Sequence, residues 1–155
     1  VVEELLKVHY NELFGLECIE LRKNDVQKKL TELNWFMTAY YNKIRKSVKE
    51  TEVKNKLSAT LITKILMGSL GCVPAYDRYF IDGVKGQKVT TGIYNIKSIL
   101  KLVDFYDTNH VRLEETRKRL KVYDLPYPQM KLLDMGFWQI GFERDATMDY
   151  RWHID

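Results

Sequence analysis

The chain has 155 residues, of which 45% are apolar and 30% are charged, with only eight glycines and three prolines. This composition excludes a disordered or collagen-like chain and predicts a globular domain that can bury a core without disulfides or a metal. Lysine and arginine outnumber aspartate and glutamate by 25 to 21, which leaves a net charge of +4. A mildly basic chain is compatible with nucleic acid as a partner, but the charge balance does not identify one.

The sequence gives no support for a membrane span, an export signal or a metal site. The mean hydropathy is −0.36, and no apolar stretch approaches the ~20 residues of a membrane helix. The first residues lack the basic and apolar pattern of an export signal, so we expect a cytoplasmic protein. The sequence does not begin with methionine, and we expect it either to start inside a longer chain or to have been processed. Cys18 and Cys72 have no ligand partners at metal-binding spacing, and His9, His110 and His153 lie far apart, so we expect two buried thiols, no metal and no cofactor.

Apolar residues recur at helical spacing in the first third of the chain. They predict an opening amphipathic helix that ends near Gly15 and a long helix from Asn24 or Asp25 to about Val48. The buried face of the long helix is expected to consist of Val26, Leu30, Leu33, Trp35, Phe36, Ala39, Tyr40 and Ile44.

Glycine and proline mark the predicted helix boundaries in the middle of the chain. Ser58 is expected to cap a nearly apolar, buried helix that stops at Gly71, a residue suited to a left-handed position after the helix. Pro74 is expected to begin a short helix that reaches about Ile81. Residues 83–88, rich in glycine and lysine, are expected to form a loop.

The last third of the chain predicts three further helices, which run from Thr90 or Thr91 to Asp107, from 109 to 121 and from 129 to 142. The middle one mixes charges of both signs, which is typical of an exposed helix with internal salt bridges.

Strand-like alternation is restricted to residues 88–91. We therefore predict an all-α fold of about six or seven helices. It is expected to form a single domain over residues 1–155, in which the tail 144–155 has no assigned place.

Asp77 and Lys64 are the candidates for chemistry. Asp77 is expected in the first turn of a helix, where the positive helix end stabilises a carboxylate. It is then either a capping acid or a catalytic or ligand-orienting carboxylate. Lys64 lies in an apolar helix, so its amine either is desolvated and reactive, faces solvent, or pairs with Asp77 or Asp134.

The sequence around these two residues carries a family resemblance. Thr63-Lys64 on a buried helix is followed by a turn and then by Val73-Pro74-Ala75-Tyr76-Asp77. This pattern resembles bacterial 8-oxoguanine-glycosylase-like helical proteins and, through them, the helix-hairpin-helix DNA glycosylases. In that superfamily a Val-Pro-x-Asp-like turn delivers the catalytic aspartate to a helix N-terminus, and the turn here is similar with one residue added. The segment 132–141 also resembles the final helix of the bacterial group.

The resemblance implies a glycosylase-like fold, DNA or RNA as the partner, and Asp77 as the catalytic residue with Lys64 beside it. The glycine-rich hairpin that grips phosphate in these glycosylases has no counterpart, because residues 53–58 contain no glycine. Lys54, Lys56 and the helix end at Ser58 are expected to hold phosphate instead. The position of Lys64 differs from that of the lysine in bifunctional glycosylases, so the resemblance does not extend to lyase chemistry.

Two further kinds of residue extend the candidate nucleic-acid interface. Lys85 and Lys88, in the predicted loop, are expected to contact phosphate, and Tyr76 is expected to stack on an extruded base. A nucleic-acid site requires Lys85, Lys88, Lys54 and Lys56 to lie on the same side as Asp77.

The alternative is a non-enzymatic module that binds a protein, for example in a bacterial or phage conflict system. In that case Asp77 and Lys64 have structural roles only, and the surface carries an exposed apolar patch of roughly several hundred square ångströms.

Overall fold

The computed structural model describes residues 1–47 and 57–149, and its regular structure is almost entirely helical. The predicted all-α class is therefore confirmed, and one short hairpin is the exception within these residues. The elements, in which η denotes a 3-10 helix, are α1 (Val2–Leu5), η1 (Val8–Leu13), η2 (Cys18–Arg22), α2 (Asn24–Ser47), α3 (Ala59–Leu70), α4 (Arg78–Gly86), α5 (Ile96–Thr108), α6 (His110–Arg119), β1 (Lys121–Val122), β2 (Leu125–Pro126) and α7 (Gln129–Asp149).

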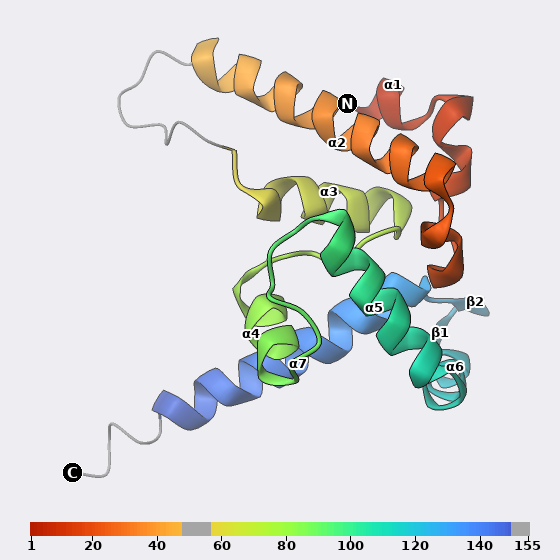
Figure 1. The fold of residues 1–155 in the computed structure, drawn as a ribbon, viewed down its shortest axis with the longest axis vertical. Coiled ribbons are helices and arrows are strands. Elements are labelled where there is room, and N and C mark those ends of the chain that lie inside the picture. Colours follow the sequence, from red (N-terminus) through yellow and green to blue (C-terminus); the bar gives the residue numbers. More distant parts are fainter. Residues whose placement is uncertain (48–56, 150–155) are drawn as a thin grey trace.

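The helices form two groups that share one continuous core. α1 and α2 lie at one end of the molecule, α4, α5 and α7 lie at the other, and α3 crosses between them (Figure 1). The buried side chains of both groups belong to a single apolar cluster, which includes Leu33 of α2, Leu66 of α3 and Phe137 of α7. Cys18 and Cys72 are both buried and unpaired, as predicted.

The opening segment is not the single helix that we predicted. It is divided into α1 and η1, with Lys7 in an extended conformation between them. Leu5 and Tyr10 are both buried, and because they lie five residues apart a continuous helix would not place them on one face. Gly15, with a φ of +54°, ends this segment and donates a hydrogen bond to the Leu70 carbonyl at 2.6 Å.

α2 begins at Asn24 as predicted, but its buried face is narrower than we expected. The residues that it buries are Val26, Leu30, Leu33 and Met37. Trp35 lies two residues from both Leu33 and Met37, so it points to the opposite side and is 72% exposed. Tyr40 and Ile44 are also exposed.

The ends of α3 follow the predicted signals. The Ser58 side chain accepts a hydrogen bond from the Leu61 N–H at 3.4 Å, which confirms Ser58 as the N-cap. Gly71 ends the helix with a φ of +67°, the left-handed conformation that favours glycine.

The prediction that a helix begins at Pro74 is wrong. α4 begins at Arg78, and residues 74–77 are not helical because the backbone N–H groups of Ala75 and Tyr76 bond to side chains of other elements. The predicted loop over 83–88 is also wrong in part, because α4 continues to Gly86 and buries Val84.

α4 and α7 pack against each other through glycines. A Cβ added to Gly83 would lie 1.9 Å from the Phe137 carbonyl oxygen, and one added to Gly141 would lie 1.9 Å from that of Tyr79. Only residues without a side chain allow this approach. α7 is also longer than predicted and extends to Asp149, so the first part of the unassigned tail is helical.

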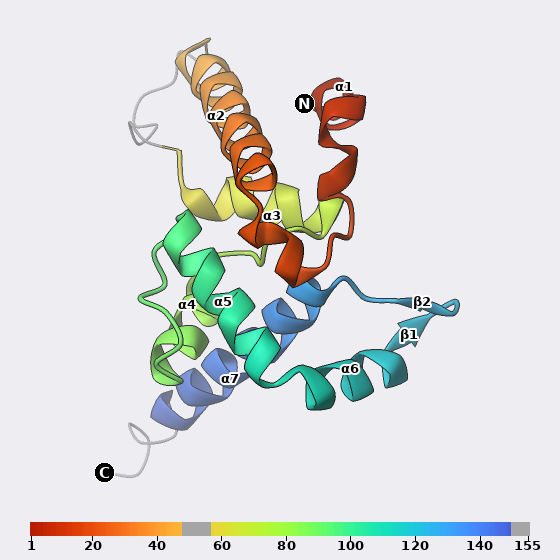
Figure 2. The ribbon, with the colours of Figure 1, turned by 45° about the vertical axis from the view of Figure 1, so that its right-hand side comes forward.

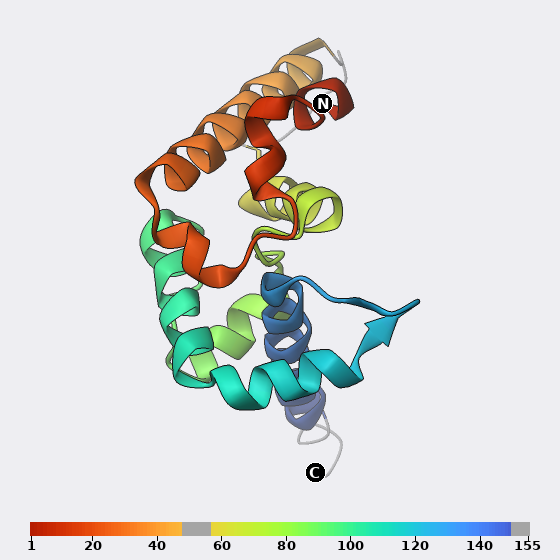
Figure 3. The ribbon, with the colours of Figure 1, turned by 90° about the vertical axis from the view of Figure 1, so that its right-hand side faces the viewer.

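The cap of α5 and the strands also differ from prediction. Asn95, rather than Thr90 or Thr91, caps α5, because Thr90 instead bonds to the Ser98 hydroxyl at 2.7 Å. The stretch 88–91 is not a strand, whereas β1 and β2 form an antiparallel hairpin that we did not predict. α6 and this hairpin project from the rest of the molecule (Figures 2 and 3).

Candidate active site between α3, α4 and α7

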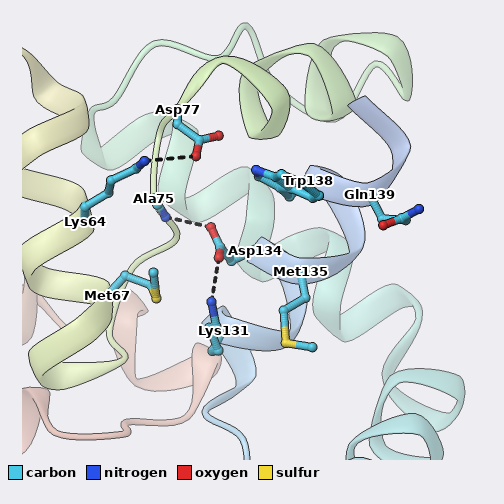
Figure 4. A pocket seen from close by; sticks show the side chains of 9 residues that line it. All are labelled: Lys64, Met67, Ala75, Asp77, Lys131, Asp134, Met135, Trp138 and Gln139. Atoms are coloured by element: carbon cyan, nitrogen blue, oxygen red, sulfur yellow. Dashed lines mark hydrogen bonds and ion pairs between the residues drawn. The ribbon is translucent and has the colours of Figure 1, made fainter. Parts of the chain in front are cut away.

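A cavity of about 590 Å³ lies between α3, the non-helical segment before α4, and α7 (Figure 4). We call it the Asp77 cavity. It combines charged, aromatic and thioether side chains from these three parts of the chain. The lining residues used below are Lys64, Asp77, Lys131, Asp134, Met135 and Trp138.

Asp77 is the N-cap of α4 and also faces Lys64. Its Oδ1 accepts a hydrogen bond from the Phe80 N–H at 3.1 Å, and its Oδ2 lies 3.4 Å from the Lys64 Nζ. The two readings of Asp77 are therefore compatible, because one oxygen caps the helix while the other is directed to the cavity (Figure 4). Of the alternatives considered for Lys64, the structure shows the pairing with Asp77, and the Lys64 side chain remains 53% exposed.

Three side chains fix the backbone that presents Asp77. The Ala75 N–H donates to Asp134 at 2.8 Å, and the Tyr76 N–H donates to the Thr63 hydroxyl at 2.9 Å. The Thr60 hydroxyl donates to the Tyr76 carbonyl at 2.8 Å. Because buried peptide groups rarely lack a hydrogen-bond partner, a different path of the segment before α4 would have to replace these three bonds. They therefore restrict the segment to one path. The position of Asp77 is thereby defined from both α3 and α7.

Asp134 is the second carboxylate of the cavity, and it is almost completely buried. Besides the Ala75 N–H, it accepts a hydrogen bond from the Lys131 Nζ at 3.0 Å. A buried carboxylate needs a countercharge, and Lys131 supplies it from the preceding turn of α7. The cavity thus carries two carboxylates and two ammonium groups.

Trp138 forms an aromatic wall of the cavity. Its ring stacks on Phe142 with a centroid separation of 5.2 Å and an interplanar angle of 7°, and it meets Tyr79 edge-on at 5.2 Å. These contacts hold the indole on α7. The nitrogen end of the indole faces the part of the cavity that contains Asp77 and Asp134 (Figure 4). A planar molecule with hydrogen-bonding groups on its edge matches this combination of ring, acceptors and donors.

The structure separates the other predicted site residues from the Asp77 cavity. Tyr76 is buried, its hydroxyl bonds to Ser98 at 2.9 Å, and burial raises its pKa to about 12. Its ring lies in the core, where no base reaches it. Ser58 caps α3 and is exposed, about 9 Å along the helix from Lys64.

Lys85 and Lys88, two of the predicted phosphate contacts, do not line the Asp77 cavity. Lys85 is exposed in the last turn of α4 and lines another cavity of about 410 Å³, between α4 and α7. Lys88 follows α4, with a φ of +57°. Lys54 and Lys56 lie outside the described residues.

Thr60, Thr63 and Trp138 are site residues that we did not predict from the sequence. Thr63 and Trp138 fall in the segments that carry the resemblance, but threonine in an apolar helix and tryptophan at helical spacing are ordinary core signals, so neither was assigned a role in the site. Asp134 was considered only as an ion-pair partner for Lys64, whereas it contacts Lys131 and Ala75 instead.

The described residues contain no group of three or more histidine, cysteine, aspartate or glutamate side chains that could hold a metal ion. None of the helices in residues 1–47 and 57–149 has the length and apolar character needed to span a bilayer. A scan of protein-family models and searches of curated proteins and of solved structures found no match to the chain.

Proposed function

We propose that this protein binds nucleic acid and hydrolyses the bond between an unpaired base and its sugar, as a glycosylase-like enzyme. One observation carries the proposal: Asp77, presented at a helix N-terminus beside Lys64, shares a cavity with the ring of Trp138. A carboxylate and an aromatic wall are the two groups needed to hold a base and act on its sugar.

The dimensions and chemistry of the Asp77 cavity suit a base. At about 590 Å³ it falls within the ~300–1,000 Å³ of small-molecule sites. Stacking of a base on an aromatic side chain contributes about 1–3 kcal/mol, and the half-buried Trp138 ring, which lines the cavity and stacks on Phe142, offers such a surface. The mixed charges of the walls provide acceptors for amino groups and donors for carbonyl groups of a base.

In the proposed reaction the bond between C1′ of the sugar and the base nitrogen breaks, and its electron pair leaves with the base. Positive charge then develops on the sugar, where the Asp77 carboxylate stabilises it or orients the attacking water. The water oxygen forms a bond to C1′ and releases a proton, and the departing base nitrogen takes up a proton. Lys64 holds the Asp77 carboxylate in position through their ion pair, without forming a covalent bond to the sugar.

The proposal is tested by combining a binding assay with a base-release assay. Labelled single- and double-stranded DNA and RNA are titrated by fluorescence anisotropy over a salt series, and oligonucleotides that contain damaged bases are assayed for abasic product. We expect binding that weakens with salt. Asp77→Asn should reduce base release about 100-fold or more with little change in affinity, because asparagine is also a good N-cap.

Asp82→Asn is the matched control, because Asp82 is a half-exposed carboxylate about one turn further along α4, where it pairs with Arg78 at 3.9 Å. It should retain both activities. Absence of binding by the wild-type chain at low salt, or equal base release by the wild type and Asp77→Asn, would overturn the proposal.

A second candidate function, the non-enzymatic protein-interaction module, is favoured by a separate observation. Val8 and Trp35 are 82% and 72% exposed on the N-terminal helices. Trp35 also lines a cavity of about 450 Å³ beside Tyr10 and Glu32. If the wild-type chain binds no nucleic acid but forms a complex that Trp35→Ser abolishes, this candidate replaces the first.

A further inference from the structure

We propose that α6 and the β1–β2 hairpin form an arm that binds an unpaired stretch of nucleic acid. In this arm Tyr123 stacks on a base, and Lys118, Arg119 and Lys121 contact the flanking phosphates. The arm is defined as residues 110–126. The inference shares with the proposed function the assumption that the ligand is nucleic acid, but it does not depend on chemistry in the Asp77 cavity.

The arm is a surface feature that contacts the core through the partly buried Leu113. α6 contains no buried residue, and every residue from 118 to 126 is exposed. The hairpin extends away from the body next to the beginning of α7 (Figures 2 and 3). It therefore presents both of its faces to a ligand.

Tyr123 occupies an unusual conformation at the tip. The strands pair Val122 with Leu125, which leaves Tyr123 and Asp124 as a two-residue turn with φ values of +51° and +63°. Asparagine and glycine are favoured in such a turn, whereas a bulky side chain there carries a backbone cost. The Tyr123 side chain is 95% exposed, so burial does not offset that cost. An aromatic ring kept in solvent at a strained turn fits a side chain that stacks on a ligand.

The arm carries an excess of positive charge. Among the residues that the structure describes, much of that charge has no acidic side chain beside it. Residues 110–126 contain five arginines and lysines but three acidic residues. From the sequence we expected a helix with several internal salt bridges. Within the described residues, Arg117 is the only cation of α6 that forms an ion pair, and its partner is Glu114. Lys118, Arg119 and Lys121 are exposed and have no acidic partner in the described part of the chain. Clustered cations beside an exposed aromatic ring are typical of single-strand binding sites.

The arm is anchored firmly to the body at its base. Glu114 accepts hydrogen bonds from the Tyr106 hydroxyl at 2.7 Å, from Gln129 at 2.9 Å and from the Arg117 Nε at 3.0 Å. Arg117 also donates to the Tyr127 carbonyl at 3.2 Å, just beyond the hairpin. Glu114 thus ties α6 to α5 and α7, and Arg117 ties it to the residue after the hairpin, so the backbone that carries the cations is held in place before a ligand binds.

The arm and the Asp77 cavity are close enough for one strand to reach both. Lys131, which lines the cavity, follows Pro126 by five residues, so their Cα atoms are at most about 18 Å apart. A strand whose base occupies the cavity would therefore pass the arm within a few nucleotides. The arm would select for unpaired nucleic acid, because the bases of a duplex are stacked and do not offer a face to Tyr123.

The arm is tested by anisotropy titration of the full chain with a labelled single DNA strand of about 20 nucleotides and with its duplex. Tyr123→Asn removes the ring but suits the turn, so the hairpin is retained. It should weaken single-strand binding about tenfold, whereas Tyr123→Phe, which keeps the ring, should bind like the wild type.

The phosphate-binding cations have their own readout. The variant K118Q/R119Q/K121Q should lower the slope of log K against log salt by about 2, because each phosphate that a protein neutralises on a single strand contributes ~0.7 to that slope. The variant K28Q/K43Q/K46Q removes the same charge from α2 and should leave the slope unchanged. The same changes of affinity and of slope are expected when the arm and control substitutions are made in the Asp77→Asn chain.

The outcomes separate the arm from the cavity. Weaker binding of Tyr123→Asn in a protein that releases no base supports the arm and overturns the proposed hydrolysis. Base release with unchanged affinity in Tyr123→Asn and in the arm triple variant overturns the arm and leaves the hydrolysis standing. An equal decrease of the slope in the arm and α2 triple variants, or tighter binding of duplex than of single strand, also overturns the arm.

Discussion

Gly141 of α7 lies directly against the carbonyl of Tyr79 in α4, so that an added Cβ would be 1.9 Å from that oxygen. Two residues before Tyr79, Asp77 caps α4, and one turn before Gly141, Trp138 lines the cavity. The close helix contact therefore sets the distance between the carboxylate and the aromatic wall. The geometry of the candidate site depends on a position that carries no functional group.

We predict that Gly141→Ala lowers the free energy of unfolding by about 3 kcal/mol, because the methyl group would overlap backbone that cannot move aside. Gly136→Ala is the control, since Gly136 lies in the same helix with no atom within 4 Å of an added Cβ. It should raise stability by about 0.5–1 kcal/mol through helix propensity. Urea unfolding monitored by circular dichroism measures both changes, and similar effects of the two substitutions would contradict this account of the helix contact.

A second prediction concerns the buried Asp134. Asp134→Ala leaves the Ala75 N–H without its acceptor and Lys131 without its countercharge. We expect it to reduce stability by about 2–3 kcal/mol. Asp104→Ala, which removes an exposed partner of Arg22, should cost less than about 1 kcal/mol. Thermal or urea unfolding of both variants tests this prediction. An equally small effect of Asp134→Ala would show that the path of the segment before α4 does not depend on Asp134.

The features that followed from local rules were predicted well. Ser58 and Gly71 define the ends of α3 through their own side-chain and backbone properties, and both were located from the sequence. The predictions that failed concern features that depend on residues distant in the chain. Proline before an acid resembles a helix start, but the Ala75 and Tyr76 N–H groups donate to Asp134 and Thr63, which keeps these residues out of a helix.

The site was predictable in part for the same reason. Asp77 and Lys64 were singled out from one continuous stretch of sequence, and they do form a pair. Trp138 joins them only because glycines let α7 approach α4, a tertiary contact that periodicity does not reveal. The hairpin was missed because Tyr123-Asp124 lacks the glycine that usually marks a turn with positive φ values.

A third prediction concerns stability at alkaline pH. Burial raises the pKa of the Cys72 thiol from near 9 to about 12. In the unfolded chain this thiol ionises at the lower value, so its contribution to stability is complete below about pH 9 and is lost as the pH rises toward 12. The slope is about 1.4 kcal/mol per pH unit. Urea unfolding between these values should show the decline, and Cys72→Ala should have a shallower one. Parallel pH profiles for the two chains would contradict the assignment.

The fourth prediction uses Glu114, at the base of the arm. Burial opposes its ionisation, but hydrogen bonds from Tyr106, Arg117 and Gln129 together hold its pKa below the usual value near 4.5. A lowered pKa means that Glu114 contributes stability above the usual value and loses it as the pH falls through the lowered one. Urea unfolding from neutral to acid pH should therefore show a loss of stability that Glu114→Gln reduces. Because Glu114→Gln also weakens the anchor of the arm, it should weaken single-strand binding at neutral pH. Glu115→Gln, one residue along on the exposed side of α6, should change neither the acid profile nor the affinity by a comparable amount.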